Sequence, residues 1–89
     1  MWHYLRALFQ ISLRQPAFAV RIERQQAAVF SGQVPQAFVK ACQEVVEREQ
    51  IAQGLIMGLN RPQGIRLEFS KAIPESARQP LRNLWQMYS

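Results

Sequence analysis

The chain holds few side chains that could act as nucleophiles, bases or metal ligands. Its single cysteine is Cys42, its single histidine is His3, and it contains no aspartate. A cysteine nucleophile needs a neighbouring base, and these two residues belong to different predicted elements. One histidine, one cysteine and scattered glutamates also give no metal-ligand spacing. We therefore expect no enzyme activity, no catalytic residue, no metal and no cofactor, and interpret Cys42 as a buried structural thiol.

The other residues that could belong to a catalytic or phosphate-binding site have simpler structural explanations. Ser31 and Ser70 precede predicted helices and have no base beside them, which favours hydrogen bonding in a turn or cap. Glu44 and Glu47 share a predicted helix with basic neighbours, as expected for solvated ion pairs. The glycines fall in a strand pattern or a turn, so they do not form a phosphate-binding loop.

Basic side chains are the remaining candidates. Eleven Lys and Arg against six Asp and Glu give a net charge of +5, which attracts phosphate groups of lipids or nucleic acids. Arg78 and Arg82 are four residues apart and should share one face of the last helix. Arg21 and Arg66 lie in strand patterns. We take as candidate anion contacts Arg21, Arg66, Arg78 and Arg82.

The elements that position these residues come from an internal repeat. Phe30-Ser-Gly-Gln-Val-Pro35 returns as Phe69-Ser-Lys-Ala-Ile-Pro74, a shift of 39 positions (69 minus 30). A period of this size indicates a repeated supersecondary unit, and two copies fit this length. Each copy predicts two strands and a helix, over about 17–50 and 54–89.

Periodicity supplies the details within each copy. Phe18, Val20 and Ile22 alternate with polar or small residues, as in a half-buried strand. From Pro35 the apolar spacing becomes helical. In the second copy, Arg61-Pro-Gln-Gly64 suits a type I turn between antiparallel strands. A last helix begins near Pro74, and Pro80 predicts a kink or a later start.

These elements predict an α+β fold with the order α-ββα-ββα. An N-terminal helix over 1–15 precedes a single domain, 16–89, with a four-stranded antiparallel sheet and the helices on one face. That face would carry Phe18, Phe30, Met57 and Phe69. The opposite face would present Arg21, Val29, Ile56 and Arg66. Strand order stays open, as does a dimer formed by exchange of ββα units.

The predicted N-terminal helix is rich in large apolar side chains. About thirteen helical residues reach roughly 20 Å, less than the roughly 30 Å hydrocarbon core of a bilayer, which argues against a membrane span. The segment suits an interfacial helix on anionic lipid, or a helix that packs on the domain or on a second subunit. The candidate membrane or partner contacts are Trp2, Tyr4, Leu5, Leu8 and Phe9.

Several motifs together resemble a known family. These are Arg14-x-Pro16, Gly32-x-Val-Pro-x-x-Phe38, Leu67-x-Phe-Ser-x-x-Ile-Pro74 and Arg78-Gln-x-x-Arg-Asn83. The chain resembles, from about residue 14 to 85, an uncharacterised bacterial family of short proteins, a domain of unknown function. The resemblance implies a hydrophobic N-terminal anchor, from which this chain departs at Arg6 and Gln10. It implies no activity, substrate or catalytic residue.

We expect a small basic module that does not catalyse a reaction. The first hypothesis is protein–protein interaction or oligomerisation, or peripheral attachment to an anionic membrane surface, in the cytoplasm and in contact with the inner membrane. The alternative is nucleic-acid binding through a basic face. Neither hypothesis includes a small-molecule substrate.

Overall fold

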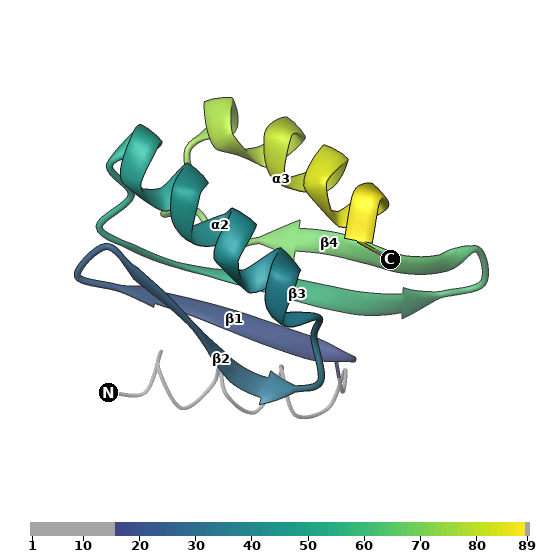
Figure 1. Cartoon of the computed structure of the whole chain (residues 1–89). Helices are drawn as coiled ribbons and strands as arrows, with labels where there is room; N and C mark the ends of the chain where they lie inside the picture. Colours follow the sequence, from purple (N-terminus) through teal and green to yellow (C-terminus); the bar gives the residue numbers. More distant parts are fainter. Residues whose placement is uncertain (1–15, 89) are drawn as a thin grey trace.

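The computed structural model describes residues 16–88 as a four-stranded antiparallel sheet covered on one face by two helices (Figure 1). The chain forms β1 (Phe18–Glu23), β2 (Gln26–Gly32), α2 (Gln36–Glu49), β3 (Gln53–Arg61), β4 (Gly64–Phe69) and α3 (Glu75–Tyr88). Each hairpin is followed by a helix that returns over the same face. The result is a two-layer α/β sandwich in which neither described helix covers the second sheet face.

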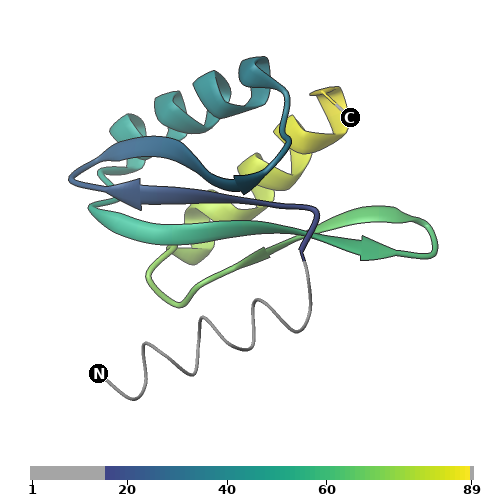
Figure 2. The ribbon, with the colours of Figure 1, turned by 90° about the horizontal axis from the view of Figure 1, so that it is seen from below.

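The strand order is β2-β1-β3-β4, so the two hairpins meet through their first strands (Figure 2). β1 and β3 are the central strands, with Val20 opposite Ile56. β2 and β4 form the two edges. The two-residue β1–β2 turn places both Arg24 and Gln25 at positive φ, at 50° and 61°. Two-residue hairpins favour this geometry, which non-glycine residues adopt at a cost.

The predicted α-ββα-ββα order is wrong for the described structure. Its first element is β1, and the order from there is ββα-ββα. The helix predicted over 1–15 lies outside the described residues, as do its candidate contacts Trp2, Tyr4, Leu5, Leu8 and Phe9.

Two of the four side chains predicted under the helices lie on the other face. Phe18 is fully buried under the helices, and Phe69 lies on the same side. Met57 pairs with Ala19, so it projects from the face away from the helices, where Phe30 also lies. Conversely, Ile56 and Val29 are predicted on the open face and lie on the helix-covered side. Ile56 is fully buried there, and Val29 pairs with Val20.

These side chains lie on unexpected faces because the two copies of the repeat are offset by one number of residues in the helices and by another in the hairpins. The helices begin 39 positions apart (75 minus 36), but the hairpin turns begin 38 apart (62 minus 24). One residue inverts every side chain of a strand, because strand side chains alternate. A β-bulge adds to this, since Val20 pairs with Val29 and Ala19 with Ser31, leaving Phe30 as the extra residue.

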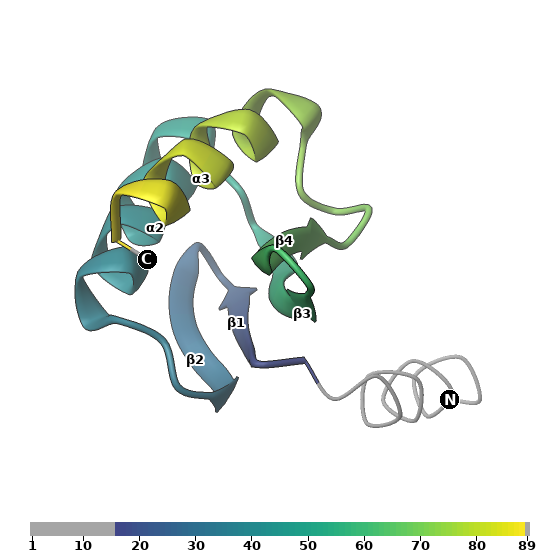
Figure 3. The same ribbon diagram turned by 90° about the vertical axis from the view of Figure 1, so that its right-hand side faces the viewer.

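The core lies between the helices and the sheet (Figure 3). At its centre the ring of Phe18 from β1 meets Phe38 of α2 and Trp85 of α3, with centroid distances of 6.2 and 5.0 Å. Gly58 makes room for this cluster, because a Cβ there would lie 2.2 Å from Cε2 of Phe18. Gly58 therefore lies on the helix-covered face, opposite Phe18.

Candidate interaction surface

Cys42 is fully buried on α2, as part of the core. Burial disfavours the charged thiolate and raises the pKa of Cys42 to about 12. At neutral pH the thiol is therefore protonated and inaccessible, which is the opposite of what a nucleophilic cysteine requires. His3, its one conceivable imidazole partner, lies outside the described residues.

Of the serines and glutamates named above, Ser70 and Glu47 make structural hydrogen bonds. The Oγ of Ser70 accepts from the backbone N–H of Leu55 at 3.0 Å, which ties the end of β4 to β3. The carboxylate of Glu47 accepts from the side-chain amide of Gln43 at 2.9 Å. Glu44 is exposed on α2, and Ser31 lies within β2. Within residues 16–88, His, Cys and acidic side chains form no group of three that could hold a metal ion.

Arg78 is engaged in holding the loop before α3. Its Nε donates to the carbonyl of Ile73 at 3.1 Å and one terminal nitrogen to that of Ser70 at 3.4 Å. The other terminal nitrogen pairs with Glu75 at 3.2 Å. Its side chain is 25% exposed, so most of its donors serve the fold and few are free for an anion.

Arg82 lies one turn further along the same side of α3. Its guanidinium carbon lies 5.1 Å from the centroid of the Phe69 ring, and that of Arg78 lies 5.9 Å from it. An arginine over an aromatic face is attracted by the ring quadrupole. The two arginines predicted to share a helix face therefore converge on one phenylalanine of β4.

Arg21 and Arg66 lie on the sheet face away from the helices, which we name the outer face. The register defines its residues, since partners of Ala19 and Arg21 share their side of the sheet. Besides the two arginines, the outer face carries Ala19, Glu23, Phe30, Leu55, Met57, Leu59 and Glu68. Its centre is thus apolar, and charges of both signs flank it.

Phe30 and Arg21 form a stacked pair on this face. The guanidinium carbon of Arg21 lies 5.0 Å from the Phe30 ring centroid, and the ring is 40% exposed. Sequence reasoning missed this pair because it placed Phe30 under the helices. A bulge in β2 was the missing information, and no glycine or proline stands there to signal one.

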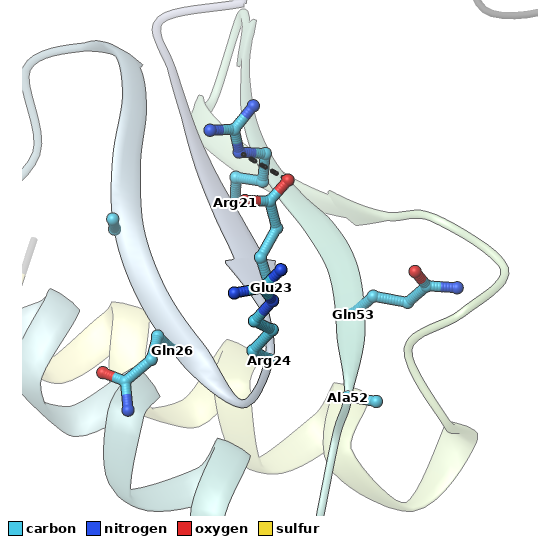
Figure 4. A pocket seen from close by; sticks show the side chains of 7 residues that line it. Arg21, Glu23, Arg24, Gln26, Ala52 and Gln53 are labelled. Atoms are coloured by element: carbon cyan, nitrogen blue, oxygen red, sulfur yellow. Dashed lines mark ion pairs between the residues drawn. The ribbon is translucent and has the colours of Figure 1, made fainter.

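A shallow cavity of about 610 Å³ lies at the β1–β2 turn (Figure 4). Arg21 and Glu23 of β1, Arg24 of the turn, and Gln53 of β3 are among its lining residues. Glu23 lies 3.7 Å from Arg21, and both side chains are largely exposed, so this ion pair is weak. The cavity extends the outer face at one end, and both charged side chains and alanines line it.

A second groove, of about 400 Å³, lies between edge strand β4 and helix α3. Ile65 and Leu67 of β4 and Trp85 of α3 supply its apolar wall. Arg66, Arg82 and Gln86 complete the lining, and no acidic residue is among the six. The structure therefore brings Arg66 and Arg82 to one groove, while Arg21 lies two strands away.

The fold and these surfaces define a small two-layer α/β domain with an apolar sheet surface that charges of both signs flank. The chain belongs to the DUF3634 family of proteins of unknown function, whose family model matches residues 6–88. No curated protein matches the chain, and no solved structure does either. Within residues 16–88, neither helix is long and apolar enough to cross a membrane.

Proposed function

We propose that this domain is a module that binds another protein and does not catalyse a reaction. The observation that carries the proposal is the outer face, which neither described helix covers and which still has an apolar centre. Phe30 is 40% exposed there, and Leu55 and Met57 are half-buried. Contiguous apolar patches with a charged border are typical of protein interaction sites.

The charges around the apolar centre favour a partner surface that carries charges of both signs. Arg21 and Arg66 lie on the outer face, and the chain carries a net charge of +5. A partner with carboxylates opposite these arginines would gain electrostatic complementarity, which speeds association and fixes orientation. Glu23 and Glu68 lie on the same face and could meet basic groups at its border.

Site-specific photocrosslinking in living cells tests this proposal. The photoreactive residue p-benzoylphenylalanine replaces Met57 on the outer face of the full chain. A matched chain carries it at Glu44, which is exposed on α2. We expect a discrete protein adduct from position 57 and none from position 44. Equal adducts from both positions, or none from position 57, would reject the outer face as the binding surface.

Single-stranded nucleic acid is a second candidate, favoured by the stacked pair of Arg21 and Phe30. An exposed aromatic ring beside an arginine on a sheet is a feature of proteins that stack bases. Glu23 argues against it, because its carboxylate lies 3.7 Å from Arg21 and would repel phosphate. Oligonucleotide binding should weaken steeply with salt and fall in Phe30→Ala. No binding at low salt would remove this candidate.

We also propose peripheral membrane attachment through residues 1–15 as a third candidate, supported by the sequence of that segment. In a bacterium this would place the protein in the cytoplasm against the inner membrane, with basic residues near anionic lipid. Flotation with anionic liposomes tests it. The full chain should float, and a full chain with both Leu5→Glu and Leu8→Glu should not. If the two behave alike, lipid attachment through this segment is rejected.

A further inference from the structure

The two edges of the sheet differ in how well they are protected against pairing with another strand. β2 carries the bulge at Phe30, which interrupts a regular edge. The side-chain oxygen of Gln43 also accepts from the backbone N–H of Ala27 on β2 at 2.7 Å. β4 has an unbroken register with β3 from Gly64 to Phe69. Among the described residues, no side chain bonds to a β4 backbone group.

The register shows which β4 backbone groups are free. The N–H of Ser70 donates to the carbonyl of Leu55 at 3.0 Å, and hydrogen-bonded pairs alternate along an antiparallel ladder. Arg66 and Glu68 therefore direct their backbone groups toward β3. Ile65, Leu67 and Phe69 direct theirs away from the sheet. A strand lying beside β4 would find three residues ready to pair.

The groove between β4 and α3 lies along this free edge. Every second side chain of an added strand would enter it, against Trp85 and beside Arg82. Its volume of about 400 Å³ is within the range of roughly 300–1,000 Å³ typical of ligand sites. Arg66 and Arg82 line it without an acidic neighbour in the lining, so an incoming carboxylate would be attracted.

We propose that β4 and α3 form a docking site for an extended acidic peptide segment, which adds to the sheet as a fifth strand. This proposal rests on the proposed protein-binding function and assigns it a second surface. Backbone hydrogen bonds would supply the pairing and Arg82 would select a carboxylate, as in other cases of β-strand addition.

A second copy of this chain fits the groove less well. Antiparallel pairing of two β4 strands keeps the helix-covered faces on the same side. The second copy would then bring its own Ile65, Leu67 and Phe69 to the groove, and no carboxylate to Arg82. The chemistry of the groove therefore favours an acidic segment of another protein.

Titration of the full chain with a terminally blocked octapeptide of alternating Val and Glu, followed by amide NMR, tests the proposal. The expected result is slowed hydrogen exchange and chemical-shift changes at the amides of Ile65, Leu67 and Phe69. A peptide with Lys in place of Glu should bind at least about tenfold more weakly. Changes confined to β2 or to the outer face, or equal binding of both peptides, would overturn the proposal.

Charge reversal supplies the matched control. Arg82→Glu should weaken binding of the Val–Glu peptide about tenfold. Arg24→Glu, at the β1–β2 turn, changes the net charge equally and should leave binding of the peptide unchanged. Circular dichroism establishes that both variants are folded. An equal effect of the two reversals would mean nonspecific attraction and contradict the site. If the Val–Glu peptide does not bind while the crosslinked adduct still forms at position 57, the groove is rejected as a docking site and the protein-binding proposal stands.

Discussion

At the scale of single residues, the side chains whose types could take part in catalysis or anion binding stabilise the fold. Cys42 is buried in the core, Ser70 ties β4 to β3, and Arg78 holds the loop before α3. Their residue types alone would suit a nucleophile or an anion contact. The position of Cys42 among the apolar residues of a helix correctly favoured a buried structural thiol. The Arg21–Phe30 stack could not be predicted, because it depends on a bulge that leaves no compositional mark.

Cys42 should make the stability of the protein fall in alkaline solution. Its pKa is raised from 9.0 to about 12 in the folded state, so the unfolded chain loses this proton first as pH rises. Stability is thus fully present below pH 9 and is lost between pH 9 and 12. Between pH 8 and 10 the contribution of this group should fall by about 1.4 kcal/mol.

Urea unfolding at the two pH values measures this loss. Cys42→Ala is the control, because it lacks the thiol and retains every other titrating group. The free energy of unfolding should fall more in the natural chain than in the variant. Equal losses would mean that the thiol is not protected in the folded protein.

Gly58 should tolerate no side chain. A Cβ there would lie 2.2 Å from the Phe18 ring, which is itself held by Phe38 and Trp85. We expect Gly58→Ala to lower the free energy of unfolding by about 1–3 kcal/mol through overpacking. Combining it with Phe18→Leu should recover part of the loss, which a thermal melt of the single and double variants would detect.

At the scale of elements, periodicity predicted the two hairpins and the two described helices, but it placed several strand side chains on the wrong face. The helix expected from Pro35 is observed as Gln36–Glu49, and the last helix runs as Glu75–Tyr88 through Pro80. Strand faces depend on a single residue of register, so the one-residue difference between helix and hairpin spacing inverted Met57 and Ile56. Strand order arises from pairing between distant segments, which no local pattern encodes.

The β1–β2 turn should gain stability from glycine. Gln25 has φ of 61°, a conformation that costs a non-glycine residue energy and that two-residue hairpins usually give to glycine. Gln25→Gly should raise the free energy of unfolding by about 1 kcal/mol. Gln25→Ala is the control, since it changes the side chain and leaves the positive φ occupied by an L-residue. Equal stabilities of the two variants would argue against strain at this turn.

Gln43 should be a stabilising contact between α2 and edge strand β2. Its side-chain amide accepts from Ala27 at 2.7 Å and donates to the Gln25 carbonyl at 2.9 Å. Gln43→Ala should cost about 1–2 kcal/mol, since it leaves a partly buried backbone donor without a partner. Hydrogen exchange at the Ala27 amide should also accelerate. Unchanged exchange would mean that Gln43 does not protect this edge.

At the scale of the whole molecule, the two helices of residues 16–88 cover one sheet face and leave the outer face and the β4 edge uncovered by either helix. Two of the arginines predicted from sequence lie at different surfaces, with Arg21 on the outer face and Arg82 in the β4–α3 groove. Sequence could nominate basic residues by type. It could not assign them to surfaces, because that assignment requires the strand order and the position of α3.

The mass of the covalent adduct formed at position 57 in living cells tests the protein-binding account most directly. Protease and nuclease digestion of the purified adduct identify what was captured. The account predicts an adduct that is sensitive to protease and unchanged by nuclease, with peptides of a second protein in its mass spectrum. A nuclease-sensitive adduct, or none at position 57, would contradict it.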